Sequence, residues 1–312
     1  MKLLVTGASG FVGKNFIKTY GNKYQIYAIV RESSNVSEIA KYCEIFCYDG
    51  KVNNLKNYLN SIFATGGGAR AKNKNSTTKF TKSDFGILHL ATKYLSSHTP
   101  NDIKDLIYAN IIFGSEVLET ALAFKPKFFI NILTFSQFAN SISYNPATFY
   151  DATKQAFYNI TQLYKDAFTE SKFLNILLYN TYGKGDTRGK FLNLWHKISL
   201  NGELLEMSEG AQKIDISHIS DVVLALELAI RNYQILDSAK IYTLENHPRY
   251  TLKEIAKIFE IATNRKLNIL WGGKPYRKNE IFNPIAESGN FIRLPKYTPK
   301  ITLKEGIKQT FT

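Results

Sequence analysis

Cysteine is scarce in this sequence, with only Cys43 and Cys47 among 312 residues. Two thiols with no second cysteine pair or histidine cluster near them are too few to build a zinc site. They flank a strand-like stretch, and side chains alternate along a strand. We therefore expect both on one face as reduced, packed thiols, and we predict no metal site.

Long apolar runs are absent as well. No stretch approaches the roughly 18 to 20 consecutive apolar residues that a membrane span requires. Residues 1–7 lead directly into a predicted strand and a glycine turn, which is unlike a secretory signal peptide. We expect a cytoplasmic protein that does not associate with a membrane.

Acidic residues are in the minority, with 26 Asp and Glu against 40 Lys and Arg and a net charge of +14. Such a balance can indicate nucleic acid, a membrane surface or phosphorylated ligands as partners. The lysines are spread over the whole chain and no nucleic-acid-binding motif accompanies them, so we do not expect nucleic acid to bind. Hydrophobic residues make up 44%, which excludes a wholly disordered chain.

The first half alternates short apolar runs with helical periods, a pattern typical of βαβ units. This predicts an α/β fold of the Rossmann type, with a doubly wound parallel sheet of six or seven strands covered on both faces. We expect strands at 2–5, 24–30, 44–48, 85–90, 127–133 and 174–179. We expect helices at 12–20, 103–123, 150–169, 220–232 and 252–263.

The alternation loosens after about residue 183. We predict a dinucleotide-binding domain over 1–182 and mainly a smaller substrate-binding lobe over 183–312, some of whose segments return to the first domain. Residues 64–82 contain three consecutive glycines and five basic residues without an acid. This composition predicts a mobile surface insertion.

A glycine-rich turn follows the first predicted strand, in the sequence Thr-Gly-Ala-Ser-Gly-Phe-Val-Gly of residues 6–13. Gly7 permits a tight turn, Gly10 lets the backbone approach a pyrophosphate, and Gly13 allows the helix to pack closely on the sheet. A glycine triplet alone also fits an ordinary strand-to-helix turn, but its place at the start of a βαβ unit favours cofactor binding. The predicted contacts are Gly7, Ser9, Gly10, Phe11, Val12 and Gly13.

The end of the second predicted strand bears on the choice of cofactor. An acidic residue there would bind the ribose 2′-hydroxyl of NAD, whereas this chain has Arg31. A guanidinium suits a 2′-phosphate, and Ser33 could add a hydrogen bond. NADP(H) is therefore preferred over NAD(H), although Glu32 next door could still reach a ribose.

Tyr150 and Lys154 are four residues apart on a predicted helix and so share a face. A tyrosine ordinarily has a pKa of about 10, and a nearby ammonium favours the phenolate. Such a phenol can exchange a proton with an alcohol oxygen. The spacing alone is weak evidence, but it gains weight from the glycine turn upstream.

With these two motifs the chain resembles the extended short-chain dehydrogenase/reductase family, also described as the NAD-dependent epimerase/dehydratase family. The resemblance covers nearly the whole chain and extends to residues 89–92, 182–186, 218–221 and 303–307. It implies a homodimer and further cofactor contacts. These contacts are Asp49, Gly50, Leu90, Ala91, Thr92, Asn110, Tyr150, Lys154 and Asn180.

The resemblance also implies a third catalytic residue, a Ser or Thr before the tyrosine helix. Thr134 is preferred and Ser136 is the alternative. Family dehydratases carry an Asp-Glu pair after that threonine, whereas this chain has Phe135 and Ser136, which disfavours elimination. The region looks most like 4-ketoreductases of the CDP-abequose synthase type.

The resemblance thus implies an NADPH-dependent reductase of the C4 keto group of a nucleotide-diphosphate-linked 4-keto-6-deoxy sugar, serving surface polysaccharide biosynthesis. Tyr150 would protonate the alkoxide, Lys154 would lower the Tyr pKa and bind the nicotinamide ribose, and Thr134 would support the oxyanion. For the diphosphate we predict Lys190, Arg188 and Arg277.

Two alternatives stay open. One is a 4-epimerase with tightly bound NAD, and the other is a redox-inactive protein that senses NADP(H). His196 could face the sugar, although a half-buried structural histidine is the preferred interpretation. Neither the base, which could belong to a CDP, dTDP, GDP or UDP sugar, nor the stereochemistry at C4 can be read from the sequence.

Overall fold

The computed structural model describes residues 1–63 and 84–312. The predicted insertion at 64–82 lies outside these residues. In the described part of the chain, no helix is long and apolar enough to cross a membrane.

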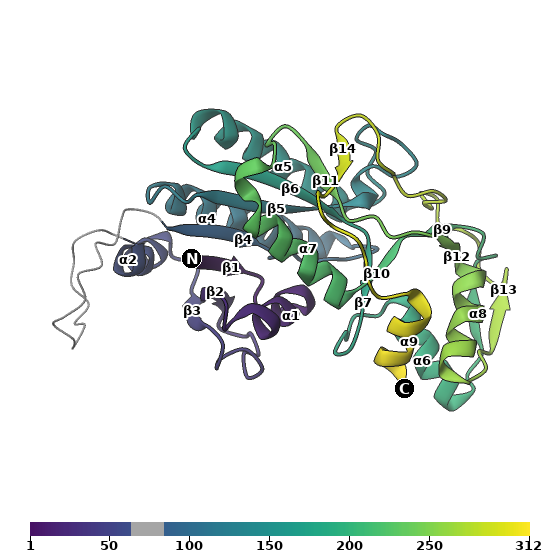
Figure 1. Ribbon diagram of the computed structural model, residues 1–312. Helices are drawn as coiled ribbons and strands as arrows, with labels where there is room; N and C mark the ends of the chain where they lie inside the picture. The colour runs from purple at the N-terminus through teal and green to yellow at the C-terminus, as the bar shows by residue number, and fades with distance from the viewer. Residues whose placement is uncertain (64–83) are drawn as a thin grey trace. The chain divides into compact units, whose positions relative to one another are not determined.

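The strands and helices follow the alternation expected from the sequence in the first half of the chain (Figure 1). The strands are β1 (Lys2–Thr6), β2 (Gln25–Arg31), β3 (Glu44–Tyr48), β4 (Phe85–His89), β5 (Phe128–Thr134), β6 (Lys172–Leu178), β7 (Asn180–Tyr182), β8 (Leu205–Met207), β9 (Lys213–Ile214), β10 (Ile216–His218), β11 (Ile241–Thr243), β12 (Tyr250–Thr251), β13 (Ile269–Trp271) and β14 (Phe291–Arg293). The helices are α1 (Phe11–Tyr20), α2 (Val52–Phe63), α3 (Ile103–Ile107), α4 (Phe113–Leu122), α5 (Phe149–Ala167), α6 (Phe191–Asn201), α7 (Ile219–Arg231), α8 (Leu252–Thr263) and α9 (Leu303–Phe311).

The main sheet has eight strands in the order β14-β11-β6-β5-β4-β1-β2-β3. Six neighbouring pairs in it are parallel: β3 with β2, β2 with β1, β1 with β4, β4 with β5, β6 with β11, and β11 with β14. The Rossmann-type α/β fold is confirmed, but the expected six or seven strands were too few. The additional strands β11 and β14 have three residues each, which is too short to produce a recognisable apolar period.

The first compact unit comprises residues 1–131, 153–174 and 233–238. It contains strands in the order β3-β2-β1-β4-β5, which reverses direction at β1 as in doubly wound sheets. All five residues of β4 are buried, as expected for a strand covered on both faces. Its core includes Leu4, Ile29, Phe85, Phe129 and Phe157.

The second compact unit comprises residues 132–152, 175–232 and 239–312. Trp195 of α6, Phe259 of α8 and Ile307 of α9 are fully buried in its core. Both α8 and α9 begin at reciprocal capping boxes, which satisfy the first backbone N–H groups of each helix.

These units do not divide the chain at residue 182, because 132–152 and 175–182 cluster with the C-terminal segments. The ring of Phe135 stacks on Tyr179 with 5.7 Å between centroids. Phe138 meets Phe291 edge to face at 4.9 Å. These aromatic contacts join segments that are far apart in the sequence.

The predicted helix 103–123 is present, but it is not regular throughout. A π-helical turn over Tyr108–Ile112 separates α3 from α4. Such a turn adds one residue to a helical turn and frequently marks a functional site. Here it contains Asn110, whose side chain is buried.

The expected packing of the two cysteines was wrong. Cys43 precedes β3 and its thiol donates to the Ile39 carbonyl at 3.3 Å. Cys47 lies within β3 and is exposed. β3 is the last strand of the sheet and only its final residue, Tyr48, is buried, so the Cys47 thiol is not packed in a core.

Candidate active site

The glycine turn joins β1 to α1 in the first unit. Gly7 has φ +66°, and a Cβ there would lie 2.5 Å from the backbone nitrogen of Ala91. A Cβ on Gly13 would lie 2.3 Å from the Gly7 carbonyl oxygen. Both positions therefore require glycine, one for its positive φ and both for close backbone approach.

The start of α1 is suited to an anion. Helix N-termini carry backbone N–H groups without intrahelical partners and a partial positive charge. Gly10 is the N-cap, no described side chain caps it, and the first turn holds no acidic residue. Ser9, Phe11 and Val12 are half-buried beside it. The residues present fit the pyrophosphate of a dinucleotide.

Thr6 and His89 connect the ends of β1 and β4 beneath this turn. The Thr6 hydroxyl lies 2.9 Å from His89 Nδ1, and the Ala91 N–H donates to Thr6 Oγ1 at 3.2 Å. Burial, with a smaller contribution from nearby Lys154, lowers the pKa of His89 to about 3. A neutral His89 therefore fixes the backbone of residues 90 and 91 against the glycine turn.

Asn110 was predicted to contact a cofactor, and the structure gives it protein partners. Its Oδ1 accepts from the Thr92 hydroxyl at 2.9 Å and from the Lys93 N–H at 2.8 Å. Its Nδ2 donates to the Lys93 carbonyl at 3.0 Å and to Thr153 Oγ1 at 2.9 Å. The π-helical turn thus anchors the loop after β4 to α5.

The residues expected around the adenosine lie at the ends of β2 and β3. Arg31 and Ser33 are exposed, as is Glu32. Asp49 accepts from the Lys51 N–H at 3.1 Å and from Asn54 Nδ2 at 2.8 Å, and the first of these bonds does most to hold its pKa below the usual range. Gly50 follows with φ +81°. Arg31 is the last residue of β2, and Ser33 follows it two positions later.

Tyr150 and Lys154 both belong to α5, one helical turn apart, and both are buried. Burial lowers the pKa of the Lys154 ammonium to about 8. A lysine so close to neutrality can respond to the charge of a neighbouring phenol.

Thr134 and Ser136 were alternatives in the sequence, and the structure brings them together. Their hydroxyl oxygens lie 2.8 Å apart. Ser136 Oγ is also hydrogen-bonded to Oδ1 of Asp151, the residue after Tyr150. Asp151 is fully buried and accepts at Oδ2 from the Thr148 hydroxyl at 2.7 Å and the Thr148 N–H at 2.8 Å.

Sequence reasoning did not single out Asp151. A signal was present, because Thr148 and Asp151 have the spacing of a capping box at the start of a helix. That pattern predicts a cap for α5. It does not predict the contact with Ser136, which lies fifteen residues away in the chain.

The basic residues predicted to hold a diphosphate differ in their surroundings. The Arg188 guanidinium pairs with the buried Asp186 carboxylate, 2.6 Å from Nε to Oδ1, and also donates to Thr181. Lys190 is half-buried at the N-cap of α6, and burial followed by nearby Arg188 lowers its pKa to about 7. Arg277 is exposed.

Two further candidates have structural partners. Asn180 donates through Nδ2 to the Asp215 carbonyl at 3.2 Å. His196 lies 3.4 Å from Arg265 and its ring faces Phe311 at 5.1 Å. His196 is therefore half-buried and packed within the second unit.

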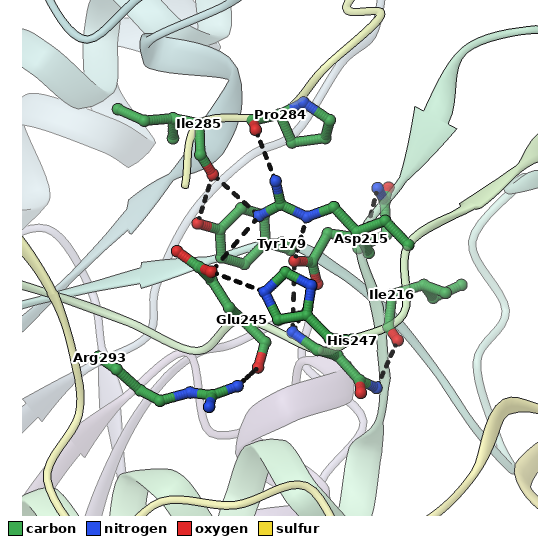
Figure 2. Close-up of polar contacts among 11 residues, drawn as sticks. Tyr179, Asp215, Ile216, Glu245, His247, Pro284, Ile285 and Arg293 are labelled. Carbon is green, nitrogen blue, oxygen red and sulfur yellow. Dashed lines mark hydrogen bonds and ion pairs between the residues drawn. The ribbon is translucent and has the colours of Figure 1, made fainter. Parts of the chain in front are cut away.

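A buried charged cluster in the second unit was also missed (Figure 2). Arg249 donates through Nε to Asp215 at 2.9 Å and through its other nitrogens to the carbonyls of Pro284 and Ile285. Its guanidinium lies 5.3 Å from the ring centroid of Tyr179, whose hydroxyl also donates to Ile285. Burial raises the pKa of Asp215 to about 7, against the opposing effect of Arg249. Through Arg249, the cluster connects residues 284–285 to Asp215, which lies between β9 and β10. No single motif signals it.

In the described residues, no group of three or more His, Cys, Asp or Glu side chains could hold a metal ion.

A family model described as the NAD dependent epimerase/dehydratase family matches residues 3–244. A CDP-abequose synthase from Salmonella muenchen is 25% identical over 313 residues, covering 99% of this chain and 96% of the relative. A CDP-abequose synthase from Yersinia pseudotuberculosis is 26% identical, covering 91% and 92%.

Among solved structures, a UDP-glucose 4-epimerase from Thermus thermophilus in complex with NAD superposes with a TM-score of 0.75 at 16% identity. The match covers 100% of this chain and 98% of that one. At this identity the likeness establishes the fold alone.

Proposed function

Because this chain belongs to the NAD dependent epimerase/dehydratase family, we propose that it reduces the C4 keto group of a nucleotide-diphosphate-linked 4-keto-6-deoxy sugar. NADPH is the proposed reductant. The similarity to CDP-abequose synthases over nearly the full length of the chain supports a nucleotide-linked sugar as substrate.

The observation that carries the proposal is the pair of buried side chains Tyr150 and Lys154, one turn apart on α5. A structural tyrosine and a solvated lysine would not need to share a buried helix face. Burial brings the pKa of Lys154 down to about 8, so its charge is sensitive to the phenol and to any ligand beside it.

The proposed cofactor is NADP(H), and its site is the glycine turn of the first unit. When bound, the nicotinamide supplies the hydride. Arg31 and Ser33 at the exposed end of β2 support a 2′-phosphate, because a guanidinium binds phosphate oxygens in a bidentate manner. Exposed Glu32 beside them keeps NAD(H) as the alternative.

Three side chains have proposed roles at the reacting oxygen. Tyr150 donates its proton to the oxygen as negative charge develops there. Lys154 favours the phenolate that Tyr150 leaves behind and binds the nicotinamide ribose. Thr134 donates a hydrogen bond that stabilises the oxyanion.

Elimination is disfavoured by the residues after Thr134. Loss of water across C5 and C6 needs an acid and a base at this place, whereas the chain provides Phe135 and Ser136. Phe135 stacks on Tyr179, and Ser136 is hydrogen-bonded to Asp151. Neither residue supplies an acid and base pair.

For the diphosphate, Lys190 is the strongest of the three predicted residues. It combines an ammonium with the N-terminus of α6, and both favour an anion. Arg188 already pairs with Asp186, so it neutralises that carboxylate before any ligand binds. Arg277 is exposed and stays a prediction.

We further propose a homodimer through the helical segments 103–123 and 150–169, as the family resemblance implies. Exposed apolar side chains on these elements and directly after α5 support it: Tyr108, Ile112, Leu163 and Phe168. The cytoplasmic location and the role in surface polysaccharide synthesis stay predictions.

The test is NADPH oxidation by the purified protein with nucleotide-linked 4-keto-6-deoxy sugars that differ in their base. Oxidation with one base and not with the others would support the reductase and identify the nucleotide. Tyr150→Phe should lower kcat by about a thousandfold, because it removes the general acid, while NADPH binding is unchanged.

The second candidate is a 4-epimerase with bound NAD, favoured by Glu32 next to Arg31. An epimerase would copurify with NAD and interconvert sugars without added reductant. A redox-inactive sensor would bind NADP(H) equally well with Tyr150→Phe and would oxidise no NADPH. Absence of NADPH oxidation with every sugar would overturn the reductase.

A further inference from the structure

The hydroxyl of Thr134 is the outer end of a chain of hydrogen bonds in the second unit. Thr134 Oγ1 lies 2.8 Å from Ser136 Oγ, and Ser136 is hydrogen-bonded to Asp151 Oδ1. The other oxygen of Asp151 accepts two hydrogen bonds from Thr148. The chain thus connects the residue proposed to stabilise the oxyanion to a carboxyl group that is fully buried.

The number of protons in this series of hydrogen bonds decides whether Thr134 can donate a hydrogen bond to a reacting oxygen. A hydroxyl has one proton, and an ionised carboxylate only accepts. When Asp151 is ionised, Ser136 donates to Asp151, so the bond between Ser136 and Thr134 must use the proton of Thr134. Thr134 then has only lone pairs to offer to a reacting oxygen.

A proton on Asp151 allows the opposite order. The carboxyl group donates to Ser136, Ser136 donates to Thr134, and the Thr134 proton is available for the reacting oxygen. Because Thr148 supplies two donors to Oδ2, the proton of Asp151 belongs on Oδ1, which faces Ser136.

We propose that Asp151 is a positioning residue whose proton sets the direction of this chain and so decides whether Thr134 can donate to the reacting oxygen. The proposal rests on the proposed reduction, in which charge develops on that oxygen and a donor is needed. No proton leaves the chain. Tyr150 supplies the proton of the product, and the three groups only reorient theirs.

The surroundings of Asp151 favour the neutral form. Burial raises the pKa of Asp151 above its ordinary value, although the bonds from Ser136 and Thr148 oppose the shift. Tyr144 faces it from the preceding loop, while Tyr150 and Lys154 share its helix. In the described part of the chain, no lysine, arginine or histidine forms an ion pair with Asp151, so no cation holds it ionised.

Asp151→Asn tests this directly, because an amide has the hydrogen-bonding pattern of the protonated acid. The Asn oxygen can accept from Thr148, and its NH₂ group then donates to Ser136. The wild-type kcat/KM should fall about tenfold as pH rises through the Asp151 pKa, the effect of one hydrogen bond to a charged oxygen. The Asp151→Asn variant should keep its low-pH kcat/KM across the pH range in which the wild-type kcat/KM falls.

Two further variants control the result. Ser136→Ala interrupts the chain and leaves the Thr134 proton free, so it too should lack the Asp151 step. Asp166→Asn, the same substitution at an exposed position of α5, should keep the wild-type profile. An Asp151→Asn profile identical to wild type would overturn the proposal, since a residue that only caps α5 would not change it.

Infrared spectroscopy separates this proposal from the proposed reaction. The carboxylic acid C=O band that Asp151→Asn removes should persist in the wild type at pH values above 3.8, the ordinary pKa of an Asp. Thr134→Val should shift this band, because Ser136 loses its partner. No such band, or a band unaffected by Thr134→Val, would overturn the proposal without any substrate. A titrating band that responds to Thr134→Val, in a protein that oxidises no NADPH, would overturn only the reductase.

Discussion

The glycine turn of the first unit and the buried cluster around Arg249 in the second unit are built in different ways. The turn depends on backbone conformation, with φ +66° at Gly7 and no room for a Cβ. The cluster depends on side chains, since Arg249 joins Asp215 to the carbonyls of Pro284 and Ile285. A site that depends on backbone conformation is visible in the sequence as a local motif. A cluster of side chains is not, because its residues are far apart in the sequence.

The largest expected effect on stability comes from a substitution in the Arg249 cluster. Arg249→Met leaves the buried Asp215 carboxylate without its cation and should lower the free energy of unfolding by about 4 kcal/mol at pH 8. Asp215 has a folded-state pKa of about 7, above its ordinary 3.8, so the fold already loses stability as pH rises between these values.

Removing the guanidinium raises the folded-state pKa of Asp215 further, so the pH range in which the fold loses stability becomes wider. The decrease in the free energy of unfolding caused by Arg249→Met should therefore be smaller at pH 5 than at pH 8. Urea unfolding at the two pH values measures it. The double variant Arg249→Met with Asp215→Asn should recover part of the stability. An equal loss at both pH values would show that the ion pair is not what the cluster depends on.

Gly7→Ala tests the glycine turn. It should lower the free energy of unfolding by about 3 kcal/mol, because of the positive φ and the overlap with Ala91. It should also weaken dinucleotide binding at least tenfold. Gly185→Ala is the matched control, because Gly185 has φ +83° but no atom within 4 Å of its Cβ position. Its expected cost is about 1 kcal/mol. Equal costs in thermal unfolding would mean that close approach is unimportant at Gly7.

Lys190 sharpens the comparison, because it adds a side chain to a helix N-terminus. Lys190→Met should raise KM for the nucleotide sugar about tenfold and leave NADPH binding unchanged. The pKa of Lys190 is lowered to about 7, so its cationic form prevails below that pH. Wild-type KM should therefore rise above pH 7, and KM of the variant should not. A variant with the same pH dependence would remove Lys190 from the substrate site.

The smallest expected effect is at Arg31, which is exposed and contributes little to stability. Arg31→Ala should lower the ratio of kcat/KM for NADPH over NADH about tenfold, since a bidentate phosphate contact is lost. Steady-state kinetics with both cofactors measures it. An unchanged ratio would favour NAD as the cofactor.

The sequence predicted the fold class and most strands of the first unit, because parallel βαβ units combine buried runs with amphipathic helices. Local spacing led to the prediction of Tyr150, Lys154 and the glycine turn as site residues. It could not predict the contact of Ser136 with Asp151 or the pairing of Arg188 with Asp186. Both contacts depend on the path of a loop after a strand or helix ends, and the hydrophobic periodicity of the sequence does not predict that path.

The strand count shows the same limit. β11 and β14 have three residues each, so tertiary pairing rather than intrinsic propensity makes them strands. The exposed Cys47 is a further case, since a strand at the edge of a sheet reads like an internal one in sequence.

The π-helical turn at Tyr108–Ile112 amounts to one residue inserted within a helix. Deleting a residue there would regularise the helix and rotate Asn110 away from Thr153. An alignment of this chain with a homologue that has a regular helix here should therefore open its gap inside the helix rather than in the adjoining loop.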